Sequence, residues 1–436
     1  MPGDSQVPIH TLAEWARVDL PGVRLGRADR ALCERLSDQN DRRLTITELH
    51  DGLRVQTSSW VGLVRIDAAQ IHVVPKLAGE YLGLVRLLEW ISGVDELTDL
   101  KSDPRIDLTG SHLLDLVALL LVREVERVLR RGARSDYVAR EEVLPVLRGR
   151  LLLDRQLRRR RGRLDLLECR YDDRSGDIFD NRLLLAAVER CATRSGEVGV
   201  RRRATRAKAR LTEICDARGV SLPRRPVKYD RLNAYYRRAH ELAWLVLEGT
   251  QGLDDLYVSG DTRSFAFLLD MNRLFERFVE RVLQVALASR GVDLSFQHRT
   301  GSVVRRADSG RTYSQLIPDV LVRSEQSVAT WPIDAKYKRY SERKVDPSDI
   351  AQVFLYATSL GVQEGERPPH GLIIYPAEAH DLERTPLAVR RAQGTLLASV
   401  TALGIPIPRV LDEVASYEGP NTLTDEVADA VLERVA

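Results

Sequence analysis

The amino-acid sequence predicts a multidomain α+β protein with a strand-rich N-terminal domain (residues 1–105), a helical basic middle domain (106–261) and a C-terminal α/β domain (262–436). Three observations lead to this fold class. A chain of 436 residues is too long for one ordinary hydrophobic core. The spacing of its apolar residues changes from strand-like to helical and then alternates between the two periods. Its basic residues are concentrated in the middle of the chain.

The composition is that of a globular protein without membrane spans. Apolar residues make up 44% of the chain and charged residues 30%, as is typical of folded domains. Residues 1–7 contain no basic segment followed by an apolar run, so no secretory signal is expected. The longest apolar stretch, Leu113–Val122, is interrupted by Asp115 and is too short to cross a bilayer. We expect a cytoplasmic protein in which this stretch is a buried helix.

The sequence offers no pattern for zinc, a disulfide or a nucleotide. Cys33, Cys169, Cys191 and Cys215 form no CxxC pair, and we expect them to be buried thiols. The histidines form no HExxH pattern typical of zinc hydrolases. No GxxxxGKS/T loop occurs, so the chain itself is not expected to bind or hydrolyse a nucleotide.

Charge is distributed unevenly along the chain. Residues 121–240 contain 32 Lys and Arg against 17 Asp and Glu, a net charge of +15, whereas the remainder carries −12. Such segregation is typical of a region that faces a polyanion. The alternative, an Arg-rich but merely solvated helical surface, carries equal weight.

Residues 1–105 are predicted to begin with a short helix, Thr11–Ala16, and to continue as strands. The strands are short runs rich in β-branched residues between Gly, Asp or Ser turns: Leu44–Leu49, Gly52–Gln56, Gly62–Ile66 and Gln70–Val74. A helix over Tyr81–Ile91 follows. This part has no catalytic pattern, and we expect it to dock a partner.

The middle of the chain, from about Ser111 to Leu247, has helical apolar spacing. The predicted helices are Leu113–Arg130, Asn181–Cys191 and Arg201–Cys215, and the densest basic runs are Arg158–Arg161 and Arg201–Arg203. Tyr235-Tyr236-Arg237-Arg238 places aromatics beside cations, which can stack on bases; a half-buried aromatic pair with solvated arginines is the alternative that we favour. Gly249–Gly260 is the predicted linker.

The last segment alternates between helical and strand periods, which predicts an α/β plan. A helix is expected over Phe267–Ala288 and another over Pro347–Leu360. The expected strands are Asp293–His298, Ser302–Arg306, Leu316–Arg323, Val328–Lys336 and Gly371–Tyr375.

The stretches Ile317-Pro318-Asp319 and Pro332-Ile333-Asp334-Ala335-Lys336 carry the candidate chemistry. Asp334 and Lys336 are two apart, so on a strand they share a face. With a turn at Ser324–Ser327, Arg323 would pair with Val328, and Asp319 would lie opposite Pro332 and diagonal to Asp334. Diagonal side chains lie roughly 7 Å apart or less, which allows two carboxylates to share a divalent cation.

Phosphodiester cleavage uses this set of groups. Carboxylates bind Mg²⁺ (Mn²⁺ is the alternative) without excluding its waters, and the ion polarises the phosphate and acidifies the attacking water. Lys336 can orient that water and offset charge in the transition state. Asp319 and Asp334 are therefore the candidate metal ligands, and the three residues together form a candidate catalytic set.

Three further residues are candidates for the same site. Gln352 and Tyr356 share a helical face, where they could contact a nucleic-acid strand; Tyr356 could instead be a core residue whose hydroxyl reaches the surface. Glu276 could complete the metal shell or be a solvated residue of an amphipathic helix. Tyr337-Lys338-Arg339 extends the positive surface or is a solvated strand end.

The PD…DxK pattern with a following QxxxY resembles the PD-(D/E)XK nuclease superfamily, in the branch of RecB-type nucleases. The order of motifs resembles the McrC family, the nuclease subunits of McrBC-type modification-dependent restriction systems. The supporting stretches are Leu147–Arg150, the region from Cys169 to Asp180–Leu184, and Asp270–Glu276.

The resemblance implies an anti-phage DNA endonuclease that works with a partner. An McrB-like AAA+ GTPase would assemble into a hexameric ring that recognises modified DNA, and the McrC-like chain would stimulate its GTP hydrolysis and cut the DNA. Asp319, Asp334 and Lys336 match the family's catalytic positions, Gln352 and Tyr356 the auxiliary motif, and Glu276 a less specific position. The His found before the first strand in some RecB-type relatives has no counterpart.

Two other functions remain open on the sequence alone. The chain could be a non-catalytic adaptor that links a motor ring to DNA. It could also be a stand-alone nuclease of the repair or resolvase kind.

Overall fold

A computed structural model describes the residues 8–37, 42–76, 80–92, 113–161, 163, 165–216, 227, 229–250, 265–297, 304–325, 328–362, 368–415 and 422–432. The chain forms two compact units. Unit 1 consists of residues 1–61, 67–97 and 269–436, and unit 2 consists of 62–66 and 98–268. Strands β5 (Trp60–Ile66) and β10 (Phe265–Asp270) pass from one unit into the other. The three-domain division made from the sequence stays a prediction.

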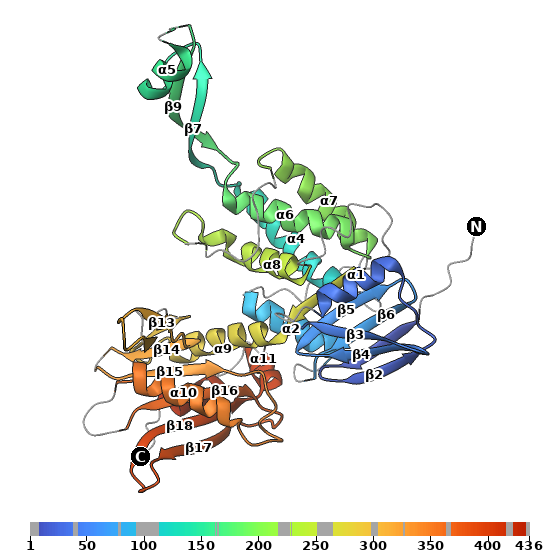
Figure 1. Ribbon diagram of the computed structural model, residues 1–436, viewed down its shortest axis with the longest axis vertical. Coiled ribbons are helices and arrows are strands. Elements are labelled where there is room, and N and C mark those ends of the chain that lie inside the picture. Colours follow the sequence, from blue (N-terminus) through green and yellow to red (C-terminus); the bar gives the residue numbers. More distant parts are fainter. Residues whose placement is uncertain are drawn as a thin grey trace. The chain divides into compact units, whose positions relative to one another are not determined.

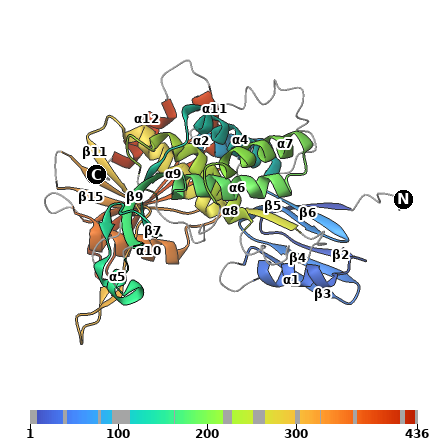
Figure 2. The same ribbon diagram turned by 90° about the horizontal axis from the view of Figure 1, so that it is seen from above.

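The N-terminal part of unit 1 is rich in strands, as predicted. Strand β1 (Ile9–Ala13) pairs in parallel with β6 (Ala69–Val74). A separate antiparallel sheet has the order β2-β4-β3, and α1 packs on β3 (Figure 2). The bounds are Arg17–Pro21 for β2, Arg27–Leu36 for α1, Leu44–Leu49 for β3, Gly52–Thr57 for β4 and Glu80–Ser92 for α2. The predicted helix at Thr11–Ala16 is wrong, because Leu12 and its neighbours instead extend the sheet beside β6.

The C-terminal part of unit 1 contains a six-stranded mixed sheet of order β11-β14-β15-β16-β18-β17. Its strands are β11 (Val292–Phe296), β14 (Val320–Ser324), β15 (Thr330–Ala335), β16 (His370–Pro376), β17 (Glu383–Arg390) and β18 (Leu396–Ile405). A two-stranded hairpin, β12 (Val304–Arg305) with β13 (Thr312–Ser314), precedes β14. The helices of this part are α9 (Met271–Leu287), α10 (Pro347–Leu360), α11 (Ile407–Ala415) and α12 (Thr422–Leu432).

Helix α10 has the predicted bounds, and it packs on β15, β16 and β18. Its first turn is fixed by Asp346, whose side chain accepts a hydrogen bond from the Ser348 amide, and by Pro347 at the start. Val353 of α10 belongs to a buried cluster with strand residues such as Ile373. A Cβ on Gly371 would lie 2.6 Å from Val353, so glycine permits this close approach.

Helix α9 begins later than predicted. Its N-cap is Asp270, whose side chain accepts from the Asn272 amide, and residues Phe265–Asp270 form β10 instead of helix. Phe267 and Leu268 lie on this strand, although their apolar side chains fit the helical spacing of the residues that follow. A short, fully buried strand is a continuous apolar run, so its hydrophobic pattern cannot be distinguished from that of a buried helix.

Unit 2 is a group of helices with a β-arm. The helices are α4 (Leu113–Arg131), α6 (Phe179–Arg194), α7 (Val198–Thr212) and α8 (Arg237–Gly249), preceded by a short 3₁₀ turn at Ala234–Tyr236. The arm, residues 136–175, extends away from these helices (Figure 1). It consists of β7 (Asp136–Leu144), β8 (Arg150–Leu151), α5 (Leu153–Arg160) and β9 (Leu167–Ser175), with strand order β7-β9-β8. The purely helical interpretation of the middle segment is therefore wrong in the arm.

Helix α4 buries the apolar stretch Leu113–Val122 completely, as predicted. None of the described helices is long and apolar enough to cross a membrane. The four cysteines are free and buried, which confirms the prediction of buried thiols. Burial raises the pKa of the Cys33 thiol to about 12 and that of Cys215 to about 11, so neither is a ready nucleophile.

Candidate active site

Asp319 and Asp334 are brought face to face by the pairing of β14 with β15. Val320 pairs with Ile333 and Arg323 with Thr330, so Asp319, one residue before β14, falls opposite Asp334. Directly opposite residues have side chains on the same face of a sheet. The predicted register, with Arg323 opposite Val328, is wrong, because Ser324 already donates its amide to the carbonyl of Ala329 and the turn is displaced along the chain.

The Asp319 carboxylate is held by a main-chain amide and a side-chain amide. Its Oδ2 accepts a hydrogen bond from the amide of Ala335 at 2.8 Å, and its Oδ1 accepts one from Gln297 Nε2 at 3.1 Å. The amide of Gln297 also donates to the Asp319 carbonyl at 2.8 Å. Asp319 therefore reaches across to the strand that carries Asp334 and is fixed there by hydrogen bonds.

Both aspartates are held at raised pKa. Asp334 is 3% exposed, and burial, together with the like charge of Asp319, raises its pKa to about 6. Burial also raises the pKa of Asp319, although its hydrogen bond from Ala335 opposes the shift. Two desolvated carboxylates at close range favour protonation or a bound cation.

Lys336 lies between the aspartates and helix α10. Its Nζ is 2.7 Å from Asp334 Oδ2 and donates a hydrogen bond to Gln352 Oε1 at 3.0 Å. Burial works to lower the pKa of Lys336, but the adjacent Asp334 raises it, and the net shift is upward. The ammonium group is therefore kept charged beside the two carboxylates.

Gln352 and Tyr356 form the second layer of this site. Gln352 Nε2 donates to the Tyr356 hydroxyl at 2.9 Å, which in turn donates to the carbonyl of Ile317 at 3.2 Å. Tyr356 is only 7% exposed, so the structure favours the alternative in which it is a core residue. The pair orients Lys336 and anchors the segment that leads to Asp319.

Glu276 on α9 is coupled electrostatically to the same centre. Burial, followed by the like charges of Asp319 and Asp270, raises its pKa to about 7. It is partly buried, unlike the solvated glutamate of the alternative interpretation. The adjacent Phe275 and Phe278 point into the core and fix this turn of α9.

The donor set fits a hard divalent cation with few protein ligands. Among the described residues, no group of three or more His, Cys, Asp or Glu side chains is arranged as a closed metal shell. Asp319 and Asp334 supply two carboxylates on one side of the sheet. Mg²⁺ is usually bound by one or two carboxylates and keeps several waters, so this pair suits Mg²⁺ better than a closed zinc-type site.

Sequence reasoning missed Gln297 and misjudged the residues after Lys336. Gln297 follows β11, which pairs with β14, so only the strand order could have indicated its place beside Asp319. Tyr337 is buried. Lys338 and Arg339 pair with the neighbouring carboxylates of Asp349, Glu342 and Glu378. Of the two alternatives for this segment, the structure does not support an extended positive surface, because these cations are neutralised locally, or a solvated strand end at Tyr337, because that side chain is buried.

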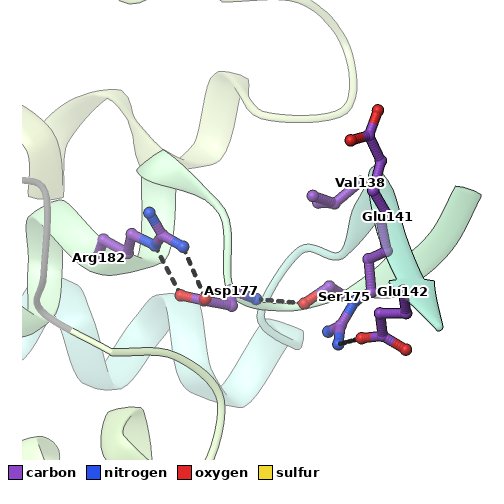
Figure 3. Close-up of a pocket in the computed structure, with 7 residues that line it drawn as sticks. Val138, Glu141, Glu142, Ser175, Asp177 and Arg182 are labelled. Atoms are coloured by element: carbon purple, nitrogen blue, oxygen red, sulfur yellow. Dashed lines mark hydrogen bonds and ion pairs between the residues drawn. The ribbon is translucent and has the colours of Figure 1, made fainter. Parts of the chain in front are cut away.

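A hollow of about 330 Å³ lies in unit 2 where the arm begins, lined by Val138, Arg140, Glu141, Glu142, Ser175, Asp177 and Arg182. Figure 3 shows that Arg182 and Asp177 pair with each other, whereas Glu141 points away from them. Arg182 binds Asp177 through two hydrogen bonds of 2.6 Å, and Arg140 lies 3.6 Å from Glu142. It contains none of the candidate catalytic residues.

A comparison with protein-family models identifies the family to which this chain belongs. The family model described as "McrBC 5-methylcytosine restriction system component" matches residues 55–376. The matched region covers most of the chain and includes Asp319, Asp334 and Lys336. The protein is thus a restriction-system component. The chain belongs to the McrBC family of 5-methylcytosine restriction system components.

One solved structure supports the fold, and a second, weaker match was also found. A chain in the half-complex of Thermococcus gammatolerans McrB AAA+ hexamers with bound McrC is 18% identical, with a TM-score of 0.53, and the match covers 97% of this chain and 100% of that one. A chain in the T. gammatolerans McrBC complex is 22% identical, with a TM-score of 0.41 over 64% of this chain and 88% of that one. A comparison with curated proteins found no match.

Proposed function

We propose that this chain is the McrC-type, Mg²⁺-dependent DNA endonuclease subunit of an McrBC-like anti-phage restriction complex. The observation that carries this proposal is the convergence of Asp319, Asp334 and Lys336 on one face of the β14–β15 pair. Membership of a 5-methylcytosine restriction family supports DNA as the substrate.

Asp319 and Asp334 would hold the cation. Glu276 would be a third carboxylate in the metal shell. Their raised pKa values support this assignment, because a divalent cation supplies the positive charge that these buried carboxylates lack. When bound, Mg²⁺ (or Mn²⁺) polarises the phosphate and lowers the pKa of its water.

The other residues of the site stabilise charge in the transition state and hold the catalytic side chains in position. Lys336 directs its ammonium group toward the reacting phosphate, where it offsets the negative charge that develops in the transition state. Gln352 fixes the Lys336 ammonium through its amide oxygen, and Tyr356 fixes Gln352. The amide of Ala335 holds Asp319 in its orientation toward Asp334.

The partner in this proposal is an McrB-like AAA+ GTPase ring, a hexamer whose GTP hydrolysis this chain stimulates. The similar structure from T. gammatolerans contains AAA+ hexamers with bound McrC. The arm of unit 2 is a suitable contact surface, because four large apolar side chains near its tip are exposed: Val146, Leu147, Leu153 and Leu157. Exposed apolar side chains gathered in this way mark protein-binding sites. The N-terminal residues 1–105 remain a second candidate for docking.

Reconstitution of the chain with its ring, GTP, Mg²⁺ and methylated DNA tests the nuclease assignment. Asp334→Asn and Lys336→Met should abolish cleavage, whereas Asp293→Asn, an exposed change on the adjacent β11, should not. Full cleavage by Asp334→Asn would overturn the proposal. Loss of cleavage with normal ring binding and GTP stimulation is the expected pattern.

The same experiment separates the two competing functions. A wild-type chain that binds the ring and DNA but never cuts, and that takes up no Mg²⁺, would be the non-catalytic adaptor. A chain that cuts without ring or GTP would be the stand-alone repair or resolvase-type nuclease.

A further inference from the structure

The exposed face of α7 (Val198–Thr212) carries a row of arginines. Arg202, Arg206 and Arg210 are spaced four residues apart and are all exposed. Four residues advance about 6 Å along a helix and turn about 40° beyond one full revolution. The three guanidinium groups therefore follow one gently curving stripe, which we call the α7 arginine stripe.

The opposite face of α7 is buried against α6 and α4. It consists of Val200, Ala204, Ala207 and Leu211. Helix α7 contains six basic residues and no acidic one. Its cations therefore cannot be balanced by carboxylates of the same helix.

Among the residues that the structure describes, cations at the edges of α7 have carboxylate partners, and those of the stripe do not. Arg203 binds Glu126 through hydrogen bonds of 2.6 and 3.3 Å, and Lys208 lies 2.6 Å from Glu189. Within the described part of the chain, no carboxylate pairs with Arg202, Arg206 or Arg210, and Glu213 just beyond the helix also forms no ion pair with them. The stripe is thus three uncompensated charges on a rigid, packed helix.

The chemistry of this face differs from that of the arm. At the arm tip, arginines alternate with exposed leucines such as Leu153 (63% exposed) and Leu157 (64% exposed), a mixture typical of protein interfaces. Between the stripe arginines lie only small or polar exposed residues, Thr205 and Ala209. One exposed apolar side chain, Val198, lies one turn before Arg202 at the start of the helix. A row of cations with so few apolar neighbours is typical of contacts to nucleic-acid phosphates, which position a protein without reading sequence.

We propose that the α7 arginine stripe binds the phosphate backbone of duplex DNA independently of its sequence. The stripe is about 12 Å long, which covers about three to four phosphates at 3.4 Å per strand position. This inference deepens the proposed function, on which it rests, by naming the surface of unit 2 that holds DNA during translocation and cutting. It needs no base contact and no methylated cytosine.

Equilibrium binding of the full chain to labelled duplex DNA tests the stripe. The measurement is made by fluorescence anisotropy in EDTA at several salt concentrations, so that cleavage plays no part. The triple variant R202Q/R206Q/R210Q should weaken binding at least about tenfold near 0.1 M salt and should lower the slope of log K against log salt by about 3. Glutamine keeps the helix propensity, and circular dichroism checks the fold.

Two controls make the result specific. R158Q/R159Q/R161Q removes the same charge from the arm and should change DNA binding far less. R202K/R206K/R210K should restore most of the affinity, because a phosphate contact accepts a lysine as a point charge.

Three results would contradict the proposal that the α7 arginine stripe binds DNA. These are an unchanged slope in the α7 glutamine variant, equal weakening in the arm variant, or DNA binding that stays normal while ring binding is lost. A chain that never cuts DNA would refute the nuclease assignment but would leave this binding result intact, so the two failures are distinguishable.

Discussion

Glu14 and Tyr337, which are 323 positions apart, share a buried hydrogen bond of 3.0 Å from the tyrosine hydroxyl to the carboxylate. Glu14 directly follows β1 and is 1% exposed, and its Oε2 also accepts the Lys76 amide at 2.8 Å. Tyr337 directly follows Lys336, and its ring lies 5.9 Å from that of Phe275 beside Glu276. The N-terminal strands of unit 1 are thereby joined to the segment that carries the candidate lysine.

The burial of Glu14 makes stability depend on pH, although its hydrogen bonds from Lys76 and Tyr337 oppose the shift in its pKa. Burial raises the pKa of Glu14 from 4.5 to about 7, so the folded chain holds a proton that the unfolded chain has released. The contribution of protonated Glu14 to the free energy of unfolding is therefore fully present below pH 4.5 and is lost as the pH rises through 7. Glu14→Gln stays neutral, so in urea unfolding it should match the wild type near pH 4.5 and exceed it by up to about 3 kcal/mol at pH 8.

The exposed change Glu325→Gln is the control for Glu14 and should leave the pH profile of the wild type unaltered. If the difference between Glu14→Gln and the wild type were the same at both pH values, Glu14 would not carry the proton.

Binding of Mg²⁺ should compete with protons. The pKa of Asp334 is raised to about 6 and that of Glu276 to about 7, so at pH 5.5 these groups are largely protonated and must lose protons to bind a cation. Affinity should therefore rise between pH 5.5 and 8 and level off above. Calorimetry at pH 6 in two buffers of different ionisation enthalpy should show proton release, and a pH-independent affinity would contradict this site.

Substitution of Gln352 should affect turnover more than DNA binding. Gln352→Ala leaves Lys336 without its amide partner, so kcat should fall by roughly 10- to 100-fold, as is typical when a residue that orients an active-site group is lost, while KM stays within about twofold. Tyr356→Phe should act in the same direction but less. Ser359→Ala, exposed on the same helix, is the control, and a rise in KM alone would show that Gln352 holds DNA instead.

The base of the arm depends on Asn181. Its side-chain amide donates to the carbonyls of Arg134 and Gly176 at 2.9 and 2.7 Å, and its oxygen accepts from the Tyr236 hydroxyl at 2.7 Å. Asn181→Ala leaves these buried groups without partners and should cost about 3 kcal/mol. Urea unfolding measures the loss, and a change below about 1 kcal/mol would mean that water replaces the amide.

The sequence predicted elements best where local chemistry and packing agree. Helix α10 was located at both ends because Asp346 and Pro347 provide a cap and Val353 provides an apolar face. The arm was missed because β7 is exposed along almost its whole length, so its residues show no alternation between core and solvent. Its charged residues carry both signs, as in a solvated loop or helix.

The sequence predicted which residues form the candidate site but not the register of the strand pair that carries them. Asp319, Asp334 and Lys336 lie together, yet the pairing depends on where the turn after Ser324 begins, and side-chain pattern alone does not fix that. Gln297 comes from a neighbouring strand, and Glu14 stabilises Tyr337 from the other end of the chain. Such partners depend on tertiary packing, which leaves no local signal in the sequence.

Residues 98–268, which form most of unit 2, are inserted in the sequence of unit 1 between residues 97 and 269. The ribosome therefore synthesises them before unit 1 is complete. At 5–20 residues per second, a ribosome needs roughly 10–30 s to pass through this stretch. During that time the first strands have been made, but the sheet that supplies Tyr337 has not. Until then Glu14 lacks its hydrogen-bond partner Tyr337. A nascent chain arrested before residue 337 should therefore be protease-sensitive in its N-terminal strands, even when the inserted helices have already folded.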